Sequence, residues 1–149
     1  MFNVGVIEHF LPEGQLAFLK RMKIFSKKFV AIGIPDYNSP IFKSFLNYFY
    51  RVNKENTKEH LEINVLNLFK KTGISFLDKI GLGIGISSKE INFKDPTLLQ
   101  FLSKILDSKD LKNFTVNHNM VDWLIKKELS LSKQDRDIFG FLDIYLGKV

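Results

Sequence analysis

Cysteine is absent from this chain of 149 residues, which excludes disulfides, thiolate nucleophiles and cysteine-ligated zinc. An apolar run of about 18 residues is absent too, so no transmembrane segment is predicted. Glu8 and His9 interrupt the apolar start early, which excludes a signal-like beginning and favours a cytoplasmic protein. Repeats and interdomain linkers are also lacking, and a chain of this length buries one sizeable core. We therefore expect a single domain over residues 1–149.

Arginine is scarce, although the chain carries a net charge of +6. Only Arg21, Arg51 and Arg136 are arginines among the 22 basic residues, and the lysines are spread along the chain rather than clustered. A basic balance could serve a nucleic acid or an anionic membrane through phosphate neutralisation. Arginine forks, however, suit phosphate recognition better than lysines do. Solvated lysine faces are favoured over an anionic partner, and no strong nucleic-acid signal is present.

The first 40 residues have the pattern strand, helix, strand. Phe2–Ile7 is apolar enough to be a buried strand, and it ends on Glu8 and His9, which need water or a ligand. A helix is predicted to begin at Pro12, and apolar residues recur along it at intervals of three: Leu16, Leu19, Met22 and Phe25. Phe29–Ile34 is a second buried strand followed by a polar turn. This order predicts a right-handed βαβ unit with a parallel pair of strands.

The next segment, Ile41–Val52, is the most aromatic in the chain. Its spacing predicts a helix with Phe42, Phe45 and Phe49 on one face. Because this helix follows a loop at the edge of the sheet, two interpretations stay open. It is either a core helix, or a lid over an apolar small-molecule acceptor or a partner surface.

The rest of the chain adds one helix, two strands and a helical insertion. Asn64 is a good N-cap for a helix that ends at Thr72 and Gly73, and Ile74–Ile80 alternates as a half-buried strand does. A helical insertion is predicted at about residues 87–134, before a last strand over Ile138–Gly147.

Four segments together resemble class I S-adenosylmethionine (SAM) dependent methyltransferases. In order and spacing they match that family's strands four to seven, and they are Asn3–Phe10, Phe29–Pro35 with its Asp36–Pro40 turn, Glu59–Leu61 leading to Leu68–Ile74, and Phe139–Leu146. The resemblance implies an α/β fold. It also implies a partial Rossmann-like sheet of about four strands, mostly parallel with the last antiparallel, and helices on both faces.

The resemblance assigns roles to residues around the first strand. The backbone at Asn3, Val4 and Gly5 would pass the sulfonium side of SAM, while Glu8 and His9 would face the methyl acceptor. His60, also beside a glutamate, is a further candidate for catalysis. Some relatives bind a divalent metal through Glu-x-x-Glu-His, but Gly5 replaces the first glutamate of that motif, so no metal is predicted.

In that family, the glycine loop that holds SAM and the acid that holds its ribose lie upstream of the matched region. The chain is therefore expected to be a half-domain that transfers methyl groups only when the missing half complements it. The unpaired edge of Phe2–Ile7 would pair either with that N-terminal half or with a second copy in a homodimer. The alternative is a non-catalytic interaction or oligomerisation module derived from a methyltransferase.

A glycine-rich stretch, Gly81–Gly85, offers a competing location for the cofactor. Glycines let backbone approach a ligand, and a turn between a strand and a helix offers free N–H groups. Against this, Lys79 and Ile80 place one residue too many between Asp78 and the first glycine, and no later strand ends in a ribose-binding acid. The plain interpretation is a turn after the third strand.

Overall fold

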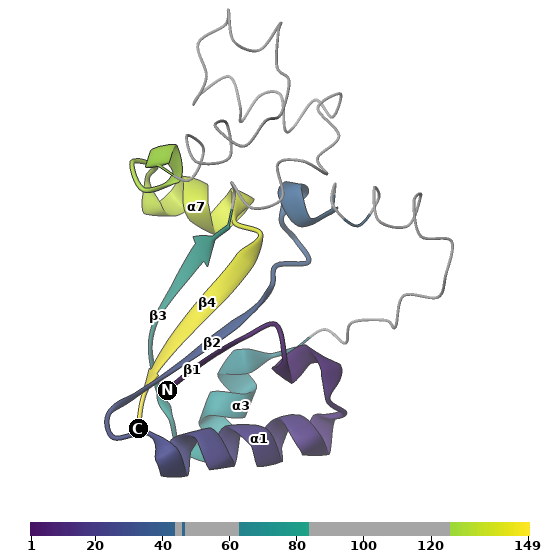
Figure 1. The fold of residues 1–149 in the computed structure, drawn as a ribbon, viewed down its shortest axis with the longest axis vertical. Coiled ribbons are helices and arrows are strands. Elements are labelled where there is room, and N and C mark those ends of the chain that lie inside the picture. The colour runs from purple at the N-terminus through teal and green to yellow at the C-terminus, as the bar shows by residue number, and fades with distance from the viewer. Residues whose placement is uncertain (44–45, 47–62, 84–125) are drawn as a thin grey trace, which may run out of the picture. The chain divides into compact units, whose positions relative to one another are not determined.

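The computed structural model describes residues 1–43, 46, 63–83 and 126–149 (Figure 1), and the chain forms two compact units. The first unit comprises Met1–Pro35, Lys58–Ile80 and Leu142–Val149. The second comprises Asp36–Thr57 and Gly81–Phe141. Among the described residues, no helix combines the length and the apolar character needed to cross a bilayer.

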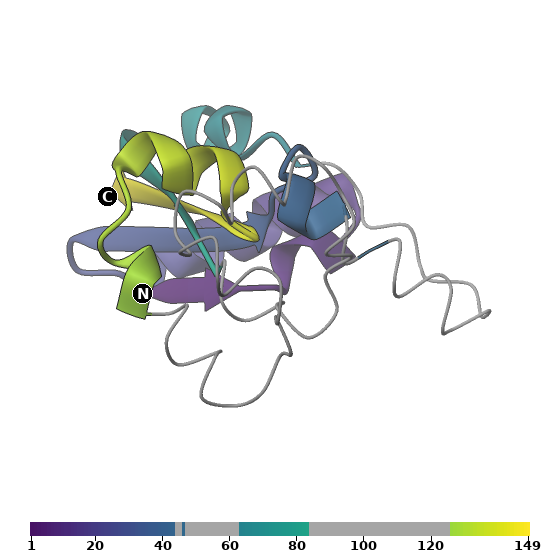
Figure 2. The same ribbon diagram turned by 90° about the horizontal axis from the view of Figure 1, so that it is seen from above.

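The fold is α/β, with a four-stranded mixed sheet in the order β1-β2-β4-β3 (Figure 2). β1 pairs in parallel with β2, and β4 pairs antiparallel with β2 along its whole length. The antiparallel last strand agrees with the sequence prediction. The strands are β1 (Phe2–Val4), β2 (Phe29–Pro35), β3 (Ser75–Leu82) and β4 (Leu142–Lys148).

The first strand is shorter than predicted, because it ends at Val4 rather than at Ile7. Gly5 has φ +68°, which only glycine adopts without strain, and its N–H donates to the Gly33 carbonyl at 3.0 Å. The chain then turns into the 3₁₀ helix η1 (Ile7–His9), which buries Ile7 completely. The apolar character that predicted a longer strand therefore reflects a residue that fills the core from a turn.

The helix predicted at Pro12 is present as α1 (Pro12–Phe25), with the proline in its first turn. It buries Leu19 and Met22, whereas Phe25 at its end stays exposed. Lys23 reaches across to the end of the next helix, where its Nζ donates to the carbonyls of Thr72 and Gly73 at 2.9 Å each. This lysine therefore caps a second helix and ties the two helices together.

That second helix is α3 (Val65–Thr72), and both of its ends follow the predicted signals. The Asn64 side chain accepts a hydrogen bond from the Asn67 N–H at 2.9 Å, as an N-cap residue does. Gly73 ends the helix in the left-handed conformation at φ +66°. The strand that follows begins at Ser75 and continues to Leu82, two residues further into the glycine-rich stretch than predicted.

The core of the first unit lies between α1, α3 and one face of the sheet. Val30, Ile32 and Ile34 project from β2 into it, and the other buried apolar members come from η1, the helices and their flanks: Ile7, Leu19, Met22, Ile63, Val65, Leu68, Phe69 and Ile74. Figure 1 shows α1 and α3 next to each other, with β3 running in the direction opposite to β4. β1, β2 and β3 thus run in the same direction, with the antiparallel β4 between β2 and β3, and α1 and α3 share the core on one face of the sheet.

The prediction of helices on both faces is therefore not met by the helices of the first unit that the structure describes. The opposite face carries Phe2 and Val4 of β1, which are 78% and 43% exposed, and Phe29 of β2, which is 40% exposed. These residues alternate with the buried ones along their strands, so they form a separate apolar face.

The last strand also begins later than predicted, at Leu142 instead of Ile138. Ile138 and Phe139 are the end of the helix α7 (Lys133–Phe139). Ser132 caps this helix by accepting a hydrogen bond from the Asp135 N–H at 3.0 Å, and this cap outweighs the local β-propensity of the two apolar residues. α7 belongs to the second unit, together with the turn that follows β2.

In the second unit, the polar turn after β2 leads into the start of the predicted aromatic helix. The Ser39 hydroxyl accepts the N–H of Ile41 at 3.2 Å, and residues 40–43 are helical. The Phe42 ring packs edge-on against the rings of Tyr37 and Phe141, with centroids 5.2 and 5.1 Å away. Phe42 is thus a core residue of this unit. Phe45, Phe49 and most of the predicted insertion at 87–134 lie outside the described residues.

Both chain ends are held at the beginning of β2. The N-terminal amine of Met1 donates to the Phe29 carbonyl at 2.9 Å. The Val149 N–H donates to the Lys28 carbonyl at 3.1 Å.

Gly147 of β4 is predicted to tolerate no side chain. A Cβ added there would overlap Ile74 Cγ2 and lie 2.8 Å from Phe69 Cε2, and both neighbours are buried. Gly147→Ala should therefore lower the free energy of unfolding by about 1–3 kcal/mol, as overpacking does. Urea unfolding measures this, with the exposed Lys148→Ala as the control. Equal stability of the two variants would show that the core is looser than described.

Candidate functional site

The residues predicted to meet a cofactor lie at the carboxyl end of β1. Asn3 is opposite Ile32 of β2, so its side chain is on the same face as the core. Val4 is opposite Gly33, and its side chain therefore points to the other face. Only Asn3 and the Gly5 turn are thus directed to the helix-covered side of the sheet. In open α/β sheets, ligands bind outside the carboxyl ends of strands.

Glu8 is the most unusual side chain at this end of the strand, because it is a carboxylate that is only 3% exposed. It folds back over the backbone turn, since its Oε1 would lie 3.6 Å from a Cβ placed on Gly5. Its Oε2 is buried and has no hydrogen-bond partner among the described residues. A buried polar atom without a partner costs about 1–3 kcal/mol, and more when it is charged.

Asn3 has the same unusual property as Glu8. Its Oδ1 is buried and accepts no hydrogen bond from the part of the chain that the structure describes. Two oxygen acceptors, Asn3 Oδ1 and Glu8 Oε2, therefore lie unsatisfied around the carboxyl end of β1. We name this pair the β1 acceptor site.

The side chains of the consecutive residues Glu8 and His9 have different environments, although the sequence analysis treated them as one candidate pair. His9 is the last residue of η1 and is exposed, whereas Glu8 is buried. The unsatisfied Oε2 of Glu8 does not reach the imidazole. A carboxylate that orients a neighbouring imidazole is therefore not formed through this atom. His60, the other predicted histidine, lies outside the described residues.

A buried ion pair was missed by the sequence analysis. Asp143 on β4 is 6% exposed, and its Oδ2 accepts from Lys79 Nζ at 2.9 Å and from the Tyr145 hydroxyl at 3.3 Å. The available signal was a single charged residue in an otherwise apolar strand. Such a residue needs a partner when it is buried. The alternation of β3 then places Lys79, rather than Asp78, on the side of Asp143.

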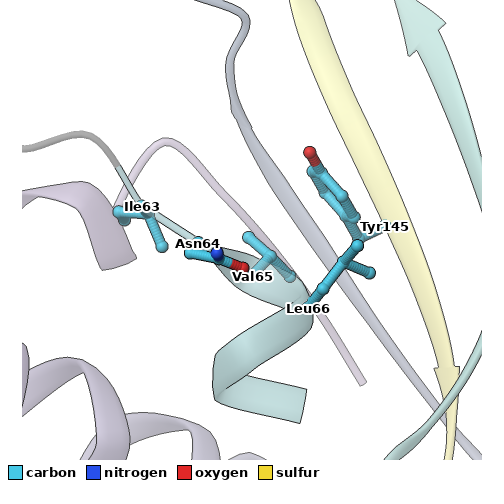
Figure 3. A pocket seen from close by; sticks show the side chains of 5 residues that line it. All are labelled: Ile63, Asn64, Val65, Leu66 and Tyr145. Carbon is cyan, nitrogen blue, oxygen red and sulfur yellow. The ribbon is translucent and has the colours of Figure 1, made fainter. Parts of the chain in front are cut away.

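A hollow of about 380 Å³ lies at the start of α3 (Figure 3). It is lined by Ile63, Asn64, Val65 and Leu66, with Tyr145 of β4 on the facing side. Tyr145 is opposite Ile32, which in turn is opposite Asn3, so these three residues form one row across the sheet. The hollow and the Asn3 side chain therefore share the helix-covered face.

The glycine-rich stretch uses its backbone within the second unit. The Gly81 N–H donates to Asp137 Oδ1 at 3.0 Å, and the Gly83 N–H donates to Glu128 Oε1 at 2.6 Å. A Cβ on Gly81 would also overlap the Arg136 carbonyl, which explains the glycine by close packing. Carboxylates of the chain itself thus occupy these two amides, which disfavours a cofactor loop here. The prediction of a plain turn is wrong for Gly81 and Leu82, because both belong to β3.

The described residues hold no group of three or more His, Asp and Glu side chains arranged to bind a metal ion. Ion pairs join Lys79 to Asp143 and Lys133 to Asp137, and neither pair includes Glu8. In the part of the chain that the structure describes, therefore, no lysine or arginine neutralises Glu8.

Glu8 is expected to reduce the stability of the isolated chain. Glu8→Gln removes the charge while keeping the shape, so it should raise the free energy of unfolding by about 1–2 kcal/mol. For a chain of this size, that corresponds to a rise in Tm of roughly 2–8 °C. Thermal unfolding measures it, with the exposed Glu13→Gln as the control. A Tm that falls would mean that Glu8 already has a stabilising partner.

The two ion pairs should differ in energy, because only the first is buried on one side. Lys79→Met removes the ammonium that pairs with Asp143 Oδ2 and should cost about 1–3 kcal/mol of stability. Lys133→Met breaks an exposed pair spaced i,i+4 and should cost less than about 0.5 kcal/mol. Urea unfolding of the two variants compares them. Similar costs would show that water reaches Asp143.

Comparison of the chain with protein-family models, with curated proteins and with solved structures finds no match. The chemistry of the site therefore has to be inferred from the side chains themselves.

Proposed function

We propose that this chain is the acceptor-side half of a SAM-dependent methyltransferase-like domain, and that it supports methyl transfer only together with the half that binds most of the cofactor. The observation that carries the proposal is the β1 acceptor site. Asn3 Oδ1 and Glu8 Oε2 are buried oxygens without partners among the described residues, and they lie where an open α/β sheet binds ligands.

The strand pairing supports this proposal. The parallel pair β1 and β2 and the antiparallel β4 are the arrangement that the methyltransferase resemblance implies. β1 is also at the edge of the described sheet, which is the position expected if a further strand is supplied from elsewhere.

The described residues fit only the reactive side of SAM. Asn3 offers a buried acceptor, and Gly5 leaves its backbone uncovered by a side chain of its own. Gly81 and Gly83 do not fit the cofactor, because their N–H groups are already bonded. Groups for the carboxylate, adenine and ribose would have to come from the other half. When bound, SAM would supply an electrophilic methyl group, while Glu8 would hold and orient the acceptor.

The edge of β1 sets a limit on the partner. Met1 and Gly5 bond to β2, so in a parallel pair the backbone groups of Phe2 and Val4 point outward. An edge with only two outward residues is very short, and shortness protects a sheet edge against unwanted pairing with other chains. The sequence alone did not reveal this protection. A second copy pairing along it would bury little. A complementary half would instead pair with the β1 edge through an added strand. It would also cover the exposed apolar face formed by Phe2, Val4 and Phe29.

A non-catalytic interaction module is the second candidate. The observation that favours it is the same exposed apolar face, since such faces mark interaction sites in monomeric proteins. The two functions differ in what they require of the β1 acceptor site. A module needs Phe2 and Val4 but is indifferent to Asn3 and Glu8.

Calorimetry of SAM binding tests the proposal. The chain alone should bind SAM more weakly than about 1 mM. The chain purified with a polypeptide that supplies the glycine loop, for example one encoded next to it, should bind SAM in the micromolar range. In that assembly, Asn3→Ala should weaken SAM binding by about tenfold, as loss of one hydrogen bond does. Asn67→Ala on the exposed side of α3 is the control.

Two outcomes would contradict the proposal. Micromolar SAM binding by the chain alone would show that the cofactor site is complete in this chain, which would bring Gly81–Gly85 back as its loop. An assembly that forms without binding SAM would identify the chain as an interaction module.

A further inference from the structure

We infer that the group received at the β1 acceptor site is an amine, held as a protonated nitrogen by Glu8 and Asn3. The place of this amine as methyl acceptor rests on the proposed function, and there the ammonium would first give one proton to the Glu8 carboxylate, which frees the nitrogen lone pair for the methyl group. Its binding does not rest on the proposed function. The inference starts from the sign of the charge. A carboxylate offers acceptors only, and Glu8 is almost completely removed from water, so its complement is a donor that carries positive charge.

The described part of the chain does not supply that charge, although the protein has six more basic than acidic residues. The lysines nearest the core are used elsewhere. Lys23 donates to the carbonyls of Thr72 and Gly73, and Lys79 pairs with Asp143. A cation from outside these residues is therefore the group that Glu8 lacks.

The number of acceptors narrows the chemistry further. Asn3 Oδ1 is a second buried acceptor at the same strand end. A hydroxyl has one hydrogen to donate, whereas a primary or secondary ammonium has at least two, so only the ammonium carries a donor for each of the two oxygens. The Asn3 amide can also turn and present its NH₂ group to the ligand. The argument that the ligand is positively charged therefore uses Glu8 and not Asn3.

The surroundings indicate the rest of the ligand. Ile7 and Ile32 next to the site are fully buried apolar residues. The alkyl part of a small amine matches these two side chains better than a polyol or a sugar does.

Nuclear magnetic resonance of the whole chain tests the inference without SAM. Methylammonium chloride is titrated while the Glu8 side-chain carboxyl and the amides of residues 5–9 are observed. Saturable shifts in the millimolar range are expected, which is what so small a ligand allows. Tetramethylammonium, which has charge but no N–H, should shift these signals at least tenfold less at equal concentration. Glu8→Gln should abolish the response, and Glu13→Gln should keep it.

Equal shifts with tetramethylammonium or sodium would overturn the inference, because charge alone would then explain them. Absence of saturable shifts would overturn it as well, since water would then satisfy Glu8. A failure here leaves SAM binding by the complemented assembly untouched, so the two proposals fail separately.

The donor could be a small amine or a lysine of the complementary half, and the assembly distinguishes these sources. If methylammonium still shifts the Glu8 carboxyl in the assembly, the site is open to a substrate amine. If the response is present in the chain alone and lost in the assembly, a partner group fills the site, and the assignment to a substrate is wrong.

Discussion

Burial of one face of β2 is the constraint on which the first unit depends. Val30, Ile32 and Ile34 have almost no exposure, and they form the floor on which α1 and α3 pack. The same strand is hydrogen-bonded on both sides, in parallel to β1 and antiparallel to β4. A shift of one residue in either pairing would move these side chains to the opposite face. The positions of Asn3 and Tyr145, on either side of Ile32, follow from that register.

The core contains two buried carboxylates, and each keeps one oxygen that accepts no hydrogen bond from the described residues, Asp143 Oδ1 and Glu8 Oε2. Asp143 has a lysine and a tyrosine hydroxyl at its Oδ2, so much of its desolvation is compensated within the chain. The Oε2 of Glu8 has no comparable partner among the described residues. Proteins keep such destabilising groups mainly where function requires them. Because Asp143 has a cation at its other oxygen and Glu8 has none among the described residues, a ligand is inferred at Glu8.

Much of the local structure could be predicted from sequence, because its causes are local. Pro12 begins α1, and Asn64 and Gly73 bound α3, since caps and turn residues act within a few positions. The ends of the strands at Val4 and Leu142 could not be predicted. Both depend on backbone choices at Gly5 and at the Ser132 cap that compete with apolar runs. Composition alone does not decide such competitions.

The candidate site was predictable in location but not in arrangement. A predicted strand followed by Glu8 and His9 directed attention to the carboxyl end of β1, where the structure places the buried oxygens of Asn3 and Glu8. That one of these side chains is buried and the other exposed depends on the 3₁₀ geometry of η1, which no periodicity in the sequence encodes. The Lys79 and Asp143 pair joins residues 64 positions apart, so it required the order of the strands.

The two chain ends are hydrogen-bonded to neighbouring residues, Phe29 at the start of β2 and Lys28 just before it, and this has a topological consequence. Met1 is bonded to Phe29 and Val149 to Lys28, so the two termini meet within one short stretch of backbone. A few residues would be enough to close the polypeptide into a ring, and the entropy lost in closing so small a gap is low. The short gap between the two chain ends lies at the amino end of β1, and Glu8 lies beyond the carboxyl end of the same strand.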